Sequence, residues 1–113
     1  MLNIAGKGRY YLYRNPTDMR KSFDGLSGLI RREMALSPQS GDVYLFVNRR
    51  ADRIKFMVWD RDGFWIYYKR LEKGVFSLPQ AGRIPFEISY DDLVLMLAGI
   101  EVFKVKKKTR FGR

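Results

Sequence analysis

The chain has 113 residues, of which 46% are hydrophobic and 15% aromatic, and it carries a formal net charge of +10. This length and composition indicate one small globular domain and exclude a chain that is disordered throughout. Because the chain contains neither cysteine nor histidine, disulfides, thiolate chemistry and catalysis that depends on an imidazole are excluded.

The N-terminal third predicts a strand followed by a helix. The stretch RYYLYR has the aromatic density of a short strand. In the NPTD that follows, Asn15 is a candidate helix cap, Pro16 suits the first helical position and Asp18 favours a helix N-terminus. Apolar residues then recur at spacings of three and four, which predicts an amphipathic helix to about residue 35.

The middle of the chain predicts strands joined by short turns. Three runs have the composition of strands: residues 42–48, 53–60 and 64–72. The last two are joined by a turn that contains Asp62-Gly63, a strong short-range hairpin signal. The segments 74–79 and 83–89 are weaker strand candidates, because each contains a proline and prolines are confined to sheet edges.

A second, short helix is expected near the C-terminus. Ser89 opens it, with Asp92 three residues later in an arrangement like a capping box, and Gly99 is expected to end it. The order of elements predicts an α+β domain with an antiparallel sheet of about four to five strands. We place the two helices mainly on one face of the sheet and expect the domain to span residues 1–103.

The last ten residues, 104–113, form a strongly basic tail. They hold six of the 22 basic residues of the chain and none of its 12 acidic residues, so 16 basic and 12 acidic residues remain in the body. Such a tail usually stays mobile and favours polyanions. Nucleic acid is the first candidate partner, and an acidic protein surface or anionic lipid is the second.

Membrane insertion is not expected. The N-terminal sequence lacks the apolar run of a signal peptide. The longest apolar run, LVLMLA, is far shorter than the roughly 20 residues that span a bilayer. We therefore expect a cytoplasmic protein with no membrane partner.

The hairpin of the second and third middle strands is apolar on both faces. Its turn places Lys55, Met57, Trp59, Phe64, Ile66 and Tyr68 on one face, and Ile54, Phe56, Val58, Trp65, Tyr67 and Lys69 on the other. One face can pack on the first helix, and the other must be covered by remaining elements or by a partner. We expect these aromatics to belong to the core, as in any small domain rich in aromatic residues. The alternative is that they are exposed beside lysines, where they would hold unpaired bases.

The loop NRRADR, which joins the first two middle strands, is the strongest candidate for a binding site. Its arginines suit bidentate phosphate contacts or guanine readout, whereas the alternative is a charged hairpin end that prevents edge aggregation. Antiparallel strands would bring the basic residues of KRLEKG to the same rim, which favours phosphate binding. The predicted nucleic-acid-binding residues are Arg49, Arg50, Arg53, Lys55, Lys69, Arg70 and Lys73 in the body, and Lys104, Lys106, Lys107, Lys108 and Arg110 in the tail.

The acidic residues do not form a recognisable catalytic set. They fall mostly at expected caps, turns and strand ends, and Asp60 and Asp62 flank a turn without a third acid clearly placed beside them. We therefore expect no enzyme activity, no metal site and no cofactor. A carboxylate-dependent nuclease is the distant alternative, and it would require Mg²⁺-dependent cleavage that is lost when Asp60 or Asp62 is changed.

Several consecutive blocks resemble one known family, the small accessory protein (TnpB, or Orf-two-like) of the bacterial insertion-sequence family sixty-six. The blocks are NPTDMRKSFDGL, NRRADRIKFMVWDRDGF, YYKRLEKGVFSLP and LAGI with the basic tail, and the resemblance runs from about residue 5 to 108. Ala51 departs from the family pattern, in which another basic residue is expected. The matched motif residues are Asn15, Pro16, Asp18, Arg20, Lys21, Asn48, Arg49, Arg50, Asp52, Arg53, Trp59, Asp60, Gly63, Lys69, Arg70 and Leu71.

The resemblance implies a protein that assists transposition beside a separate, large transposase that carries the catalytic carboxylates. It assigns no catalytic or binding role to any residue of this chain. We therefore expect a non-enzymatic transposition accessory protein that binds DNA, at the transposon ends, and assists the transposase. The alternative is an adaptor that recognises the transposase through an uncovered aromatic face and has only generic affinity for nucleic acid.

Overall fold

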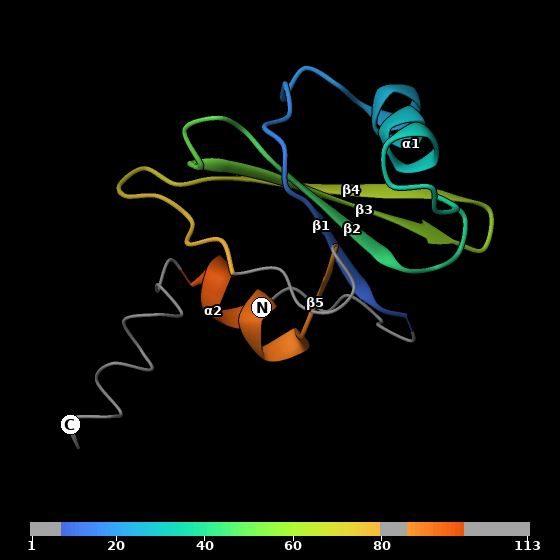
Figure 1. Ribbon diagram of the computed structural model, residues 1–113. Coiled ribbons are helices and arrows are strands. Elements are labelled where there is room, and N and C mark those ends of the chain that lie inside the picture. Colours follow the sequence, from blue (N-terminus) through green and yellow to red (C-terminus); the bar gives the residue numbers. More distant parts are fainter. Residues whose placement is uncertain (1–7, 80–85, 99–113) are drawn as a thin grey trace.

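A computed structural model describes residues 8–79 and 86–98, which form a five-stranded sheet with two helices (Figure 1). The elements are β1 (Tyr10–Tyr13), α1 (Phe23–Arg32), β2 (Val43–Val47), β3 (Arg53–Asp60), β4 (Gly63–Arg70), β5 (Glu87–Ile88) and α2 (Tyr90–Leu97). The order across the sheet is β4-β3-β2-β1-β5. The predicted α+β class is confirmed. The sheet is mostly antiparallel, but β1 and β2 pair in parallel because α1 forms the crossover between them.

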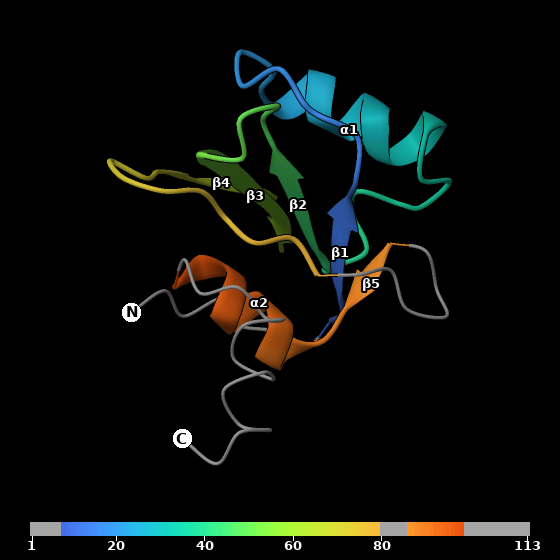
Figure 2. The same ribbon diagram turned by 60° about the vertical axis from the view of Figure 1, so that its left-hand side comes forward.

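The two helices lie on opposite faces of the sheet (Figures 1 and 2). On one face, Leu26 of α1 packs in a cluster with Phe46 of β2. On the other face, Met96 of α2 packs in a cluster with Leu45 of β2. The prediction that both helices cover mainly one face was therefore wrong. All five residues of β2 are buried, and a strand that is apolar on both faces needs cover on both.

Helix α1 begins at Phe23, later than predicted from the cap signals at Asn15. The backbone N–H of Thr17 donates to the carbonyl oxygen of Val47 over 2.8 Å, and Thr17 is buried. Residues 14–22 therefore form a loop that is held against the end of β2. The carbonyl oxygens of Met19 and Lys21 in this loop accept hydrogen bonds from the side chain of Lys55, so tertiary contacts hold the segment outside the helix that its local sequence favours.

The segment that follows β4 is irregular and packs on the α2 side. The weak strand prediction for residues 74–79 was wrong: no strand forms there, and the segment is held by the burial of Phe76 in the core and by a hydrogen bond from the Phe76 N–H to the carbonyl oxygen of Ala51. Within the other weak candidate, β5 spans Glu87–Ile88, which pairs with β1.

Helix α2 begins as predicted. The Oγ atom of Ser89 accepts a hydrogen bond of 3.1 Å from the backbone N–H of Asp92, which satisfies one free donor at the helix start. The predicted end of this helix at Gly99, and the tail at 104–113, lie outside the described residues.

Candidate nucleic-acid interface

The β3–β4 hairpin brings the two predicted basic clusters to one end of the sheet. Arg53 pairs with Arg70 across the hairpin and Ile54 with Lys69, while Asp60 and Gly63 close the opposite end. The predicted register and the convergence on one rim are both confirmed. Side chains alternate along each strand, so the two arginines face the α1 side and Lys69 faces the α2 side.

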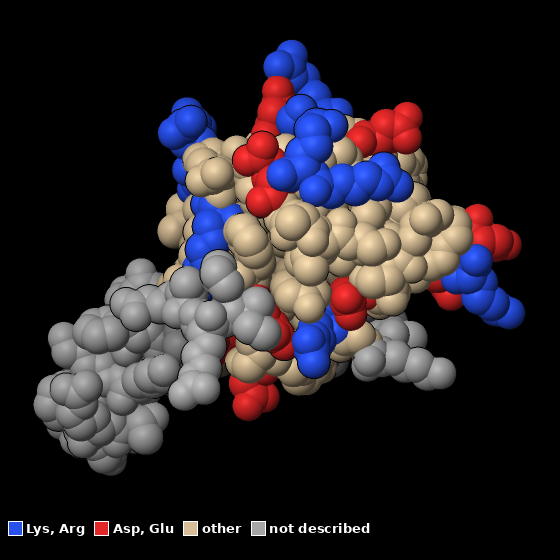
Figure 3. All heavy atoms as spheres, turned by 45° about the vertical axis from the view of Figure 1, so that its right-hand side comes forward, with Lys and Arg blue, Asp and Glu red and all other residues tan. Residues whose placement is uncertain are grey.

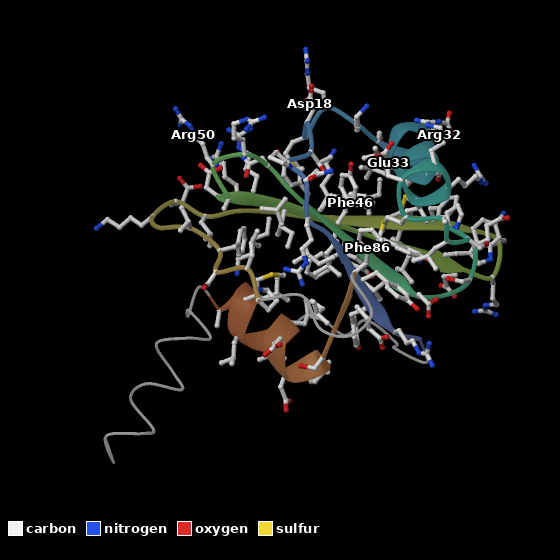
Figure 4. The ribbon with its side chains drawn as sticks, viewed as in Figure 1. Asp18, Arg32, Glu33, Phe46, Arg50 and Phe86 are labelled. Atoms are coloured by element: carbon white, nitrogen blue, oxygen red, sulfur yellow. The ribbon has the colours of Figure 1, made fainter. Side chains whose placement is uncertain are left out.

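Asn48 holds the basic loop in a fixed shape. Its side-chain Oδ1 accepts hydrogen bonds of 3.0 Å from the backbone N–H groups of Asp52 and Arg53, and its Nδ2 donates to Asp52 Oδ1 over 2.7 Å. Ala51 completes the turn with a φ of 58°, a left-handed conformation. Asp52 is thus engaged by Asn48, and Arg50 projects from this end of the sheet (Figure 4).

An open groove lies between the basic loop and the loop that precedes α1. It has a volume of about 610 Å³. It is lined by residues 16–20 of the loop before α1, by Asn48, Arg49 and Arg50 of the basic loop, by Arg53 at the start of β3, and by Tyr68 of β4. The fold therefore joins two segments that are far apart in the sequence. Ala51 does not line the groove; its side chain packs towards the α2-side core.

The charge of the groove is positive, because Arg20 balances its one acidic residue, Asp18, and Arg49, Arg50 and Arg53 remain. The guanidinium of Arg20 donates to both carboxylate oxygens of Asp18, at 2.7 to 3.1 Å. These bonds stabilise the ionised carboxylate and hold the pKa of Asp18 at about 2. Within residues 8–79 and 86–98, the ion pairs that form do not involve Arg49, Arg50 or Arg53.

Lys55 serves the fold and is not exposed. Its side chain is 8% exposed, and its Nζ donates to the carbonyl oxygens of Met19 (2.7 Å) and Lys21 (2.8 Å). The same Nζ lies 5.0 Å from the centre of the Tyr68 ring. Lys55 thus ties the loop before α1 to β3. Its predicted contact with nucleic acid is disfavoured, because the ammonium is buried and donates to two carbonyl oxygens inside the protein.

The remaining predicted residues do not line the groove. Lys69 Nζ donates to the carbonyl oxygen of Leu97 at the end of α2 over 3.0 Å. Arg70 Nε donates to Glu72 over 3.1 Å, and Lys73 is exposed in the following segment. The tail residues Lys104, Lys106, Lys107, Lys108 and Arg110 lie outside the described part of the chain.

Tyr68 and the lining residues of the loop before α1 were not singled out as binding residues by the sequence, and among them Tyr68 is the aromatic one. Its side chain is 51% exposed. The alternation of side chains along the strands predicts that Tyr68 lies on the same face as Lys55, and the register puts the two residues directly opposite one another. That signal gives the face, but the groove exists only because the loop before α1 folds over this end of the sheet.

Comparison with known proteins places the chain in a family. Residues 8–107 match the family model described as IS66 Orf2 like protein. The chain belongs to this family. Two uncharacterized proteins of Sinorhizobium fredii, y4jC and y4hO, are each 30% identical to it, over 88% and 89% of this chain and 86% and 88% of their own lengths. No solved structure matches the chain. Membership supports an accessory role in transposition, in association with an IS66 transposase system.

Two further surfaces of this IS66 Orf2-like protein bear on its function. Figure 3 shows lysine and arginine atoms gathered over the upper part of the molecule, on the side of α1, with acidic atoms among them. Basic charge is therefore not confined to the groove. On the α2 side of β4, Trp65 is 56% exposed and stacks on Tyr67, with ring centres 6.4 Å apart.

Neither a metal site nor a membrane span is found in the described part of the chain. Across residues 8–79 and 86–98, no group of three or more acidic side chains gathers closely enough to hold a metal ion. None of the helices in these ranges has the length and apolar character that crossing a membrane requires.

Proposed function

We propose that this IS66 Orf2-like protein binds DNA and assists the transposase of its element without performing catalysis itself. The observation that carries the proposal is the groove in which Arg49, Arg50 and Arg53 converge, with its acidic group already paired to Arg20. Guanidinium groups suit phosphate oxygens because their donors match them in pairs. Such a protein would work in the bacterial cytoplasm, where the DNA of the element lies.

The basic tail would act together with the groove. Its lysines and arginines would add phosphate contacts that do not depend on sequence, which raise both affinity and association rate. The folded body would then hold the register of the complex on the DNA. In this way the protein would help to position the transposon ends, or the transposase on those ends.

The proposal is tested by fluorescence anisotropy over a series of salt concentrations, with a transposon-end duplex and a scrambled duplex. The full-length chain is compared with a chain that ends at Phe103 and with two variants that each lose three positive charges. The groove variant is R49Q/R50Q/R53Q, and the control is R31Q/R32Q/R61Q, which changes exposed arginines outside the groove.

We expect the groove variant to bind DNA less tightly than the control does. Its salt slope should fall by about 0.9 for each phosphate that the missing arginines would have neutralised. Tail removal should flatten the slope while any preference for the end sequence survives. Equal losses of affinity in both variants would mean that binding follows net charge alone. If the full-length protein shows no binding at moderate salt, the proposal fails.

The second candidate function is an adaptor for the transposase. It is favoured by the exposed apolar side chains on the α2 side, where Trp65, Val75 and Leu78 are each at least 40% exposed. Most of that face of the sheet is covered by α2 and Phe76. The exposed aromatic surface is therefore smaller than the sequence of the β3–β4 hairpin alone predicts. Association with the transposase that survives nuclease treatment and is lost in W65A, with DNA binding intact, would support it.

A further inference from the structure

We infer that the groove takes an unpaired nucleotide, whose base stacks on Tyr68 while the arginines hold its phosphate. The DNA partner would then be a single strand or a locally opened duplex. The inference rests on the proposed DNA binding and adds the form of DNA that the site accepts.

The first observation that supports this inference is the exposure of the Tyr68 ring and its contact with Lys55. Half of this side chain is exposed, and it lines the groove. The Lys55 ammonium lies 5.0 Å from the ring centre and is itself held by two backbone carbonyls. The favourable contact between a cation and an aromatic ring therefore helps to hold the ring from within the protein. A ring that is held on one side and still half exposed offers a surface for stacking.

The other aromatic residues of β4 each contact another aromatic ring. The ring of Trp65 stacks on Tyr67, and the ring of Phe64 packs edge-on against Trp59. Among the ring pairs formed within residues 8–79 and 86–98, none includes Tyr68. The exposed part of the Tyr68 ring is thus left for a ligand, beside Arg49, Arg50 and Arg53, which take no part in the ion pairs of the same ranges.

The size of the groove suits a single unpaired nucleotide. A volume of about 610 Å³ is that of a small-molecule site, since such sites span roughly 300–1,000 Å³. In a duplex the faces of the bases are covered by their neighbours, so only the backbone could meet this groove. An unpaired nucleotide presents both a base face and a phosphate, and proteins hold such nucleotides by aromatic stacking beside basic groups.

The polar groups of the groove indicate that binding depends little on base identity. Both functional atoms of the Asn48 amide are used within the loop, and the Asp18 carboxylate is held by Arg20. With Arg49, Arg50 and Arg53 placed on the phosphate, few polar groups are then left to read base edges. Stacking and charge tolerate any base, because every base has an aromatic face.

The test measures binding of the full-length protein to dye-labelled oligonucleotides of one sequence, as single strand, as duplex and as duplex with a single-stranded overhang. The variants are Y68A, the conservative Y68F, and Y90A as the matched control. Tyr90 lies on α2 and is also 51% exposed, but it does not line the groove. A 2-aminopurine base in the single strand reports stacking directly by quenching of its fluorescence.

We expect the single strand and the overhang to bind more tightly than the duplex. Y68A should weaken single-strand binding by about five- to a hundredfold, the range that follows from removing one stacking partner. The same variant should abolish the quenching and leave duplex binding unchanged. Y68F and Y90A should behave like the unmodified protein.

Three results would overturn the inference. Equal binding of single strand and duplex with no effect of Y68A would show that the groove is no stacking site, although DNA binding would stand. An equal reduction of both in Y68A would mean that the ring only supports the fold through Lys55. Absence of binding to every oligonucleotide would instead overturn the proposed function itself.

Discussion

The two faces of the sheet at its basic end use their cations in different ways. On the α1 side, Arg53 and Lys55 lie two residues apart on one strand, yet Arg53 lines an open groove and Lys55 is buried against Tyr68. On the α2 side, Lys69 reaches the carbonyl oxygen of Leu97 at the end of a helix. Lys55 and Lys69 thus each bind a neighbouring element of the fold, whereas Arg53 lies where the groove stays open.

The largest expected loss of stability comes from changes in the core, and it tests whether both faces of the sheet contribute to that core. Leu45 and Phe46 are neighbours on β2, both are fully buried, and they point to opposite faces. We expect L45A and F46A each to lower the free energy of unfolding by about 3 kcal/mol or more, because each leaves a cavity. Urea denaturation measures both. A loss below about 1 kcal/mol for L45A would show that the α2 face is dispensable.

The second prediction separates Lys55 from the arginines of the groove. K55M keeps the apolar stem but leaves the carbonyl oxygens of Met19 and Lys21 without their charged donor. We expect a loss of about 2 kcal/mol in the free energy of unfolding, the usual cost of leaving buried polar groups unpaired. Thermal and urea unfolding test this. If K55M left the free energy of unfolding unchanged but weakened DNA binding, Lys55 would contact the DNA instead of supporting the fold.

The matched change on the other face should have a smaller effect. In K69M the hydrogen bond to the Leu97 carbonyl oxygen is removed, but this lysine is exposed and water can replace it. We expect the free energy of unfolding to fall by about 0.5 kcal/mol or less, as is usual for exposed charges near a helix end. A decrease as large as that of K55M would contradict the distinction between the two faces.

The smallest effect concerns the paired acid at the groove. The pKa of Asp18 is about 2 because Arg20 donates to its carboxylate. Since this pKa is lowered by folding, the pair stabilises the protein above the ordinary pKa of an aspartate. That stabilisation disappears as the pH falls from about 4 towards 2. NMR titration should find the low value and its return towards about 4 in R20Q; an unchanged pKa there would exclude Arg20 as the cause.

Local patterns of the sequence determined much of this molecule. The alternation along residues 53–70 and the turn at Asp62-Gly63 predict the hairpin register, and with it the meeting of two basic clusters at one rim. Ser89 marks the start of α2. These features depend on the period of a strand, on a short turn and on a cap, which involve residues close together in the chain.

Only the tertiary structure decided the helix faces, the late start of α1, the burial of Lys55 and the groove. Each depends on contacts between segments far apart in the sequence, such as Thr17 with Val47 and Lys55 with Met19. A lysine in a basic stretch looks the same in the sequence whether water or a backbone carbonyl accepts its hydrogen bonds. Its role follows from which loop folds over it, and that is a property of the whole chain.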